Sequence, residues 1–229
     1  MLKRSRVALA TFCWTSFFLT SLISAAFGQD GHYDASINGA AVFTTTASGN
    51  SVVQGATVGM NIFGTIRYKF RPKHSLLFNY GRTRDSQTYL TIGNNFHILN
   101  SISEVTGAYV FSPFPKAKFE PFVLAGGGAL IFSPSSTWVF FPNLPGNVPN
   151  RVQTDLGATS QTELAFLYGL GVDYKLPWYP KVSIRLQYRG FLYKAPDFHI
   201  DQSSGSLVNF FTGGKQHMAQ PTVGFAYTF

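Results

Sequence analysis

Residues 163–174 read ELAFLYGLGVDY, and this stretch decides the fold. Large apolar side chains occupy every second position from Leu164 to Tyr174, and Glu163 and Asp173 lie in the alternate positions. Successive side chains of a β-strand point to opposite faces, so this alternation predicts a strand with one apolar face. Its length suits a tilted strand that crosses a membrane, which needs about 9–11 residues.

The same alternation recurs along the chain. It is clear in residues 182–192 and 222–229, and weaker in residues 36–45, 57–69, 76–80, 104–111 and 119–132. The faces of residues 119–132 stay open, because this segment is apolar apart from Glu120 and is rich in glycine. Its Gly126–Gly128 predict close packing or a bend. Together these segments predict about eight strands, or ten if those near Trp138–Phe141 and Leu207–Phe211 pair as an extra hairpin.

The links between these segments alternate in length. Short links rich in Pro and Lys occur at Arg71–Ser75, Ser112–Lys118 and Lys175–Lys181. Longer irregular links occupy Arg84–Asn100, Pro134–Ser160 and Ala195–His217, and the link at Ser48–Ser51 falls on the same side. Short periplasmic turns and longer extracellular loops are typical of bacterial barrels. The alternation therefore predicts an antiparallel up-and-down barrel in one domain, residues 29–229.

The N-terminus predicts a cleavable secretory signal peptide over residues 1–28. Lys3, Arg4 and Arg6 precede an apolar run, and Ala26 and Gly28 occupy the small-residue positions of a cleavage site before Gln29. An uncleaved first-helix anchor is the alternative. Cleavage removes Cys13, the only cysteine, and three of the 18 basic residues but none of the 10 acidic ones, which leaves a net charge of +5. The mature chain then has no thiol chemistry, and its charge does not indicate a nucleic-acid partner.

Aromatic and charged residues favour a membrane barrel over a soluble one. Aromatics make up 16% of the chain and charged residues only 12%, against about 25% charged in soluble proteins. Phe70, Tyr174 and Phe229 end the apolar faces of their strands, with Trp178 and Tyr179 in an adjoining turn. Rings in these positions are typical of the aromatic girdle at a membrane–water interface.

The C-terminus carries a resemblance to a known family. Val223, Phe225, Tyr227 and Phe229 alternate up to the last residue, and this ending resembles the C-terminal signature of bacterial outer-membrane barrels. With the signal peptide and the link lengths, the chain resembles the small OmpA/OmpX-type barrel superfamily. The resemblance implies an outer-membrane location, contact with outer-membrane lipid and recognition of the last strand by the insertion machinery. Pro221 departs from the pattern because it lacks a ladder donor, so we expect it near the outer rim or at a bulge.

Charged residues on the polar faces of the strands are the first candidate site. They are Arg67, Glu104, Glu163, Arg185 and Arg189. An eight-stranded barrel is only wide enough for side chains to fill it, and buried charges need partners. We therefore expect an ion-pair plug joining the three arginines to the two glutamates. The alternative is a narrow porin-like pathway for ions or small solutes.

Two further candidates lie in the long links. Asp197, His199 and Asp201 have the spacing to share one side of an extended segment, which could bind a metal or activate water as in a surface hydrolase. The link Pro134–Ser160 contains Trp138, Phe140 and Phe141, which could contact an extracellular partner or fold over the barrel mouth. Spacing alone is weak evidence, so we expect a structural or surface-interaction role without catalysis, cofactor or metal.

Overall fold

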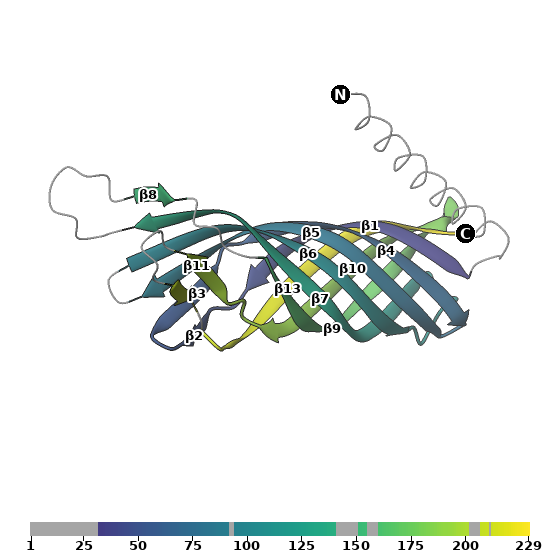
Figure 1. Cartoon of the computed structure of the whole chain (residues 1–229). Helices are drawn as coiled ribbons and strands as arrows, with labels where there is room; N and C mark the ends of the chain where they lie inside the picture. The colour runs from purple at the N-terminus through teal and green to yellow at the C-terminus, as the bar shows by residue number, and fades with distance from the viewer. Residues whose placement is uncertain (1–31, 92–93, 141–150, 155–159, 202–206, 211) are drawn as a thin grey trace, which may run out of the picture.

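The computed structural model describes residues 32–91, 94–140, 151–154, 160–201, 207–210 and 212–229. The predicted signal peptide lies outside these residues. Figure 1 shows an elongated all-β molecule. Its wall consists of eight long strands: β1 (Tyr33–Thr44), β4 (Gly59–Arg71), β5 (His74–Thr91), β6 (Asn94–Phe111), β7 (Phe119–Phe140), β9 (Gln161–Leu176), β10 (Tyr179–Lys194) and β13 (Lys215–Thr228).

These eight strands form a closed antiparallel barrel. Each pairs with the long strand that follows it in the chain, and the last, β13, pairs with the first, β1. The pairing partners can be followed from strand to strand once around the wall. The path that starts at Tyr174 on β9 returns to the same strand at Leu164, so neighbouring strands are strongly staggered. The prediction of an up-and-down barrel of about eight strands is confirmed.

Shorter strands extend the barrel at one end. β2 (Ala47–Gly49) and β3 (Val52–Ala56) form a hairpin that pairs with β5, and β8 (Arg151–Thr154) pairs with β7. β11 (Phe198–Asp201) and β12 (Leu207–Phe210) form a separate two-stranded sheet. The alternative of ten barrel strands is wrong, because Trp138 belongs to β7 and Leu207 pairs within the β11–β12 sheet. Phe141 and Phe211 lie outside the described residues.

The two ends of the barrel differ as the link lengths predicted. At the turn end, residues 72–73, 112–118 and 177–178 join consecutive strands. At the opposite end, which we call the loop end, β5, β6 and β7 continue well beyond their neighbours, as Figure 1 shows. The prediction of an irregular link at residues 84–100 is wrong, because these residues form the tip of the β5–β6 hairpin. Residues 85–88 are polar on both faces, so apolar alternation gives no signal there.

The outer face of the barrel is apolar. Outward-facing side chains such as Ile62, Leu164 and Phe225 are 67%, 81% and 64% exposed, whereas Arg67 on the inner face is only 2% exposed. This arrangement inverts that of a soluble protein and matches a wall that faces lipid. Trp178 is 80% exposed at the turn end, in keeping with an interfacial girdle. No helix within the described ranges is long and apolar enough to cross a membrane.

Two special positions shape the wall. A Cβ on Gly126 would lie 2.1 Å from the carbonyl oxygen of Gly107, so glycine lets β7 approach β6 closely, as predicted. Pro221 lies in the middle of β13 rather than near its end, and the register of β13 with β1 is the same on both sides of it. The expectation of a rim position or a bulge is therefore wrong. Instead, the β1–β13 ladder has no pairs at Ala41 and Val42. This gap lies opposite Pro221, which has no N–H to donate.

Candidate functional site: the filled interior of the barrel

Four charged side chains from four strands meet inside the turn end of the barrel. Arg67 on β4 contacts Asp34 on β1, with Nε 2.6 Å from Oδ2, and also contacts Asp173 on β9. Arg185 on β10 bridges the same two carboxylates, with Nε 2.7 Å from Asp173 Oδ1 and Nη2 3.1 Å from Asp34 Oδ1. Two arginines and two aspartates leave no net charge. Their mutual pairing offsets much of the cost of removing them from water.

This four-residue cluster, hereafter the turn-end cluster, is also closed by packing. Its side chains are at most 3% exposed. The guanidinium carbons of Arg67 and Arg185 lie 5.5 and 5.8 Å from the centre of the Phe122 ring. Arg185 Nη1 also donates to Ser36 Oγ at 3.1 Å. Cations over an aromatic face gain attraction where water is excluded, so the cluster fills this part of the interior tightly.

A second ion pair lies closer to the loop end. Arg189 on β10 and Glu104 on β6 pair at two points, Nη1–Oε1 2.8 Å and Nη2–Oε2 3.0 Å. The Arg189 guanidinium also lies 3.6 Å from the centre of the Phe63 ring and donates to the Gln220 side chain. Glu104 accepts further hydrogen bonds from Asn61 and Thr106. A two-point arginine–carboxylate pair with further donors is among the stronger polar contacts in proteins.

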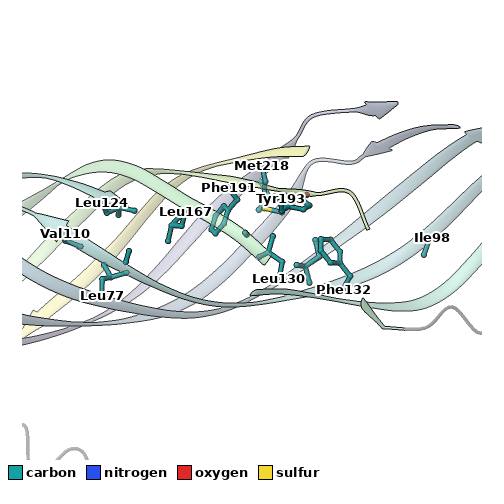
Figure 2. Close-up of a cluster of buried hydrophobic side chains, with 14 of the residues drawn as sticks. Leu77, Ile98, Val110, Leu124, Leu130, Phe132, Leu167, Phe191, Tyr193 and Met218 are labelled. Atoms are coloured by element: carbon teal, nitrogen blue, oxygen red, sulfur yellow. The ribbon is translucent and has the colours of Figure 1, made fainter. Parts of the chain in front are cut away.

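Apolar side chains occupy the interior on the loop-end side of this pair. Figure 2 shows Leu130, Phe132, Leu167, Phe191 and Met218 converging from different strands. None of these five side chains is more than 1% exposed. The inner face therefore carries its ion pairs toward the turn end, where apolar side chains such as Val110 are also buried, while polar side chains such as Gln54 and Gln87 are buried at the loop end. We expected a polar inner face throughout, and β7 contradicts this because its apolar residues point both inward and outward.

The predicted plug residues fall into two groups. Arg67, Arg185, Arg189 and Glu104 all lie inside the barrel, but only Arg189 pairs with Glu104. Glu163 is half-exposed at the loop end of β9 and joins none of these pairs. The aspartates that hold the other two arginines were missed as partners. Asp173 had been assigned to the polar face, whereas Asp34 precedes the predicted start of the first strand at residue 36.

One carboxyl group at the loop end, that of Asp85, lies beyond the apolar band of the wall, because its neighbours on the outer face of β5 are Arg84 and Ser86. Burial raises the pKa of Asp85 to about 6, although Thr57 Oγ1 donates to its Oδ1 at 3.1 Å and its own side chain accepts from the Ser86 N–H. Asp85 therefore gains a proton near neutral pH more readily than an exposed aspartate.

Most of the metal or hydrolase candidate lies outside the described side chains. Asp197 forms an ion pair with Lys194 at 3.0 Å, while the side chains of His199 and Asp201 lie outside those described. Among the described residues, no group of three or more His, Cys, Asp or Glu side chains could hold a metal. The side chains of Trp138 and Phe140 likewise lie outside the described set.

The C-terminal signature lies on the outer wall. Val223, Phe225 and Tyr227 are 53%, 64% and 42% exposed on β13. Phe229 packs edge-on against Tyr227, with ring centres 5.1 Å apart, and its N–H donates to the Tyr33 carbonyl at 2.9 Å. The chain end is thus part of the barrel closure rather than a tail.

Comparison with known proteins rests on structure alone. No family model matches the sequence, and no curated protein matches it. The outer membrane protein OprG from Pseudomonas aeruginosa aligns with a TM-score of 0.55 at 12% identity, covering 88% of this chain and 97% of that one. A major outer membrane protein from Thermus thermophilus aligns with a TM-score of 0.51 at 16% identity, covering 86% of this chain and 99% of that one. The chain therefore has the fold of the small bacterial outer-membrane β-barrels to which it is similar.

Proposed function

We propose that this protein is an outer-membrane anchor whose barrel interior is plugged. Its role is carried by the part of the chain that projects beyond the membrane. The observation that carries this proposal is the filled interior. The turn-end cluster, the Arg189–Glu104 pair and the apolar cluster follow one another along the barrel axis. An ion entering this interior would meet paired charges, hydrogen-bonded polar side chains and apolar side chains, which favours a plug over the porin-like pathway.

The projecting part consists of a continuous sheet at the loop end. Its strand order is β2-β3-β5-β6-β7-β8, as the register of the ladders gives it. β7 has 22 residues, about twice the 9–11 residues that a membrane-spanning strand needs. The excess length stands free of the membrane, so it offers a surface to other molecules.

Side-chain contacts hold this sheet in shape. Gln54 on β3 donates to Gln87 on β5 at 2.6 Å, and Tyr89 donates to the same Gln87 oxygen at 3.0 Å. His97 on β6 contacts Thr88 and Ser86 on the neighbouring strand. A surface held by several cross-strand contacts loses less entropy on binding than a mobile loop would. This supports an interaction role for the loop end.

The orientation that this role requires can be tested in whole cells. Single cysteines placed at Ser51 in the β2–β3 hairpin and at Lys116 in a turn-end link would be treated with a membrane-impermeant maleimide. The proposal predicts labelling at residue 51 in intact cells, and at residue 116 only after the outer membrane is opened. The reverse pattern would contradict the proposed exposure of the loop end.

A further inference from the structure

A groove of about 680 Å³ hollows the outer wall over β13, β1 and β4. Its outward-facing lining is apolar, from Gly39, Ala41, Met60, Ile62, Pro221 and Val223. The floor of the groove is low because Gly39 has no side chain, and a Cβ built on it would have nothing within 4 Å. The register places Met60 opposite Ala41, and both Ile62 and Val223 opposite Gly39, so the groove crosses the three neighbouring strands at this level.

Two arginines border the loop-end side of this groove. Arg82 and Arg84 on β5 face outward and are exposed, directly opposite Ile62 and Met60 on β4. Side chains paired in this way have Cβ atoms about 4.5–5.5 Å apart. The outward positions of β5 that precede Arg82 are apolar and exposed, namely Leu76, Phe78 and Tyr80. The arginines therefore lie where the lipid-facing band ends.

The guanidinium groups have little to neutralise them on the protein. Arg82 donates from Nε to Ser101 Oγ at 2.8 Å, and among the described residues Arg84 has no ion pair. The carboxylates of the barrel strands instead point inward: Asp34, Asp85, Glu104, Glu120 and Asp173 are all buried. An exposed arginine pair beside an apolar groove is complementary to a phosphate that carries an acyl chain, because arginine binds phosphate oxygens at two points.

We infer that this groove and the Arg82–Arg84 pair bind a phosphorylated, acylated glycolipid of the outer leaflet. One acyl chain lies in the groove over Gly39 and Ala41, and a phosphate meets the two guanidinium groups at the membrane boundary. This inference rests on the proposed outer-membrane orientation, with the loop end outward.

The test measures lipid bound to the refolded mature chain. The barrel is placed in phosphatidylcholine nanodiscs with lipid A, with dephosphorylated lipid A, or with inorganic phosphate, and bound molecules are counted by native mass spectrometry. We expect preferential retention of lipid A, and retention about five-fold weaker for each arginine removed in Arg82→Gln and Arg84→Gln. Gly39→Leu should fill the groove and weaken retention of both acylated lipids. Inorganic phosphate alone should not be retained.

Matched variants separate a site from general lipid contact. Arg71→Gln removes an exposed cation at the turn end, and Gly107→Leu adds the same side chain to an outward glycine on β6, where the nearest atom to a new Cβ is 3.9 Å away. Neither should change lipid A retention. Equal retention in all variants, or equal loss in the controls, would overturn the inference. Barrel dimers that Gly39→Leu abolishes, without any lipid dependence, would also overturn it and assign the groove to a second copy.

Folding and orientation are checked independently of lipid binding. Each variant must show the heat-dependent gel shift of a folded barrel before it is scored. The maleimide labelling described above tests the orientation in cells, so a failure of the proposed function is distinguishable from a failure of the lipid site.

Discussion

Arg189 and Glu104 pair at two points inside the barrel, although they belong to β10 and β6, which are not neighbours in the wall. The pair spans the interior and ties two parts of the wall together. Both side chains are almost fully buried, at 1% and 3% exposure. A buried charge whose partner is removed is left uncompensated, which is far more costly than replacing both partners.

We predict a strong coupling between these two residues. Glu104→Gln or Arg189→Met alone should lower the free energy of unfolding by about 3–5 kcal/mol, because each leaves one charge buried without a partner. The double variant should lose much less than the sum. Urea unfolding in lipid vesicles measures all three, and Lys194→Met, which breaks an exposed ion pair, serves as the control that should hardly change stability. Strict additivity of the two single effects would contradict the coupling.

A second prediction concerns the close approach of β7 to β6. Gly126→Ala should destabilise the barrel by about 1–3 kcal/mol or prevent its folding, because the new Cβ meets the backbone of β6. Gly39→Ala makes the same chemical change on the open outer wall and should be tolerated. The fraction of heat-resistant folded band on a gel compares the two. Equal folding of both variants would show that β7 can move away from β6.

The loop end should be less stable at higher pH. The pKa of Asp85 is about 6 in the folded chain, against about 3.9 when it is unfolded. The folded state thus binds the proton more tightly, and the stability from protonation is full below pH 4 and is lost as pH rises through 6. At 1.36 kcal/mol per pKa unit the loss amounts to about 3 kcal/mol. Asp85→Asn should remove this dependence, as followed by hydrogen exchange of β3 and β5 amides at pH 4 and 8. The same pH slope in both proteins would exclude Asp85 as its source.

The C-terminal strand provides a fourth prediction. Phe229→Ala and Tyr227→Ala should slow assembly in cells if the insertion machinery recognises the alternating rings at the C-terminus, as the resemblance to outer-membrane barrels implies. Leu170→Ala removes an exposed apolar side chain from β9 and should assemble at the normal rate. Pulse-chase measurement of heat-resistant barrel separates these outcomes, and equal rates in all three variants would remove the proposed role of the terminus.

Much of the barrel could be predicted because one face of each spanning strand meets lipid. Residues 163–174 alternate plainly for this reason. The tips of β5 and β6 could not be predicted, because Asp85 and Gln87 on one face alternate with Ser86 and Thr88 on the other, and all four are polar. Alternation also fails in β7, where Phe122 and Phe132 fill the interior and Val123 faces outward.

The charged side chains of the interior could be predicted individually, but their partners could not. Polar-face positions identified Arg67, Arg185, Arg189 and Glu104. The pairing depends on the stagger of the whole wall, which brings Asp34 from the start of β1 to the level of Asp173 near the end of β9. A stagger of this kind is a property of the closed barrel, and no local segment of sequence carries it.

The interior of the barrel is blocked to ions in the proposed function, and single-channel conductance of the refolded mature chain in a planar bilayer tests this most directly. The sample must show the heat-dependent gel shift, and an open porin in the same bilayer confirms that current steps are detectable. The filled interior predicts a folded barrel that remains electrically silent. Discrete, reproducible current steps from the wild-type barrel, altered in size by Arg185→Gln, would contradict it and identify the interior as an ion path.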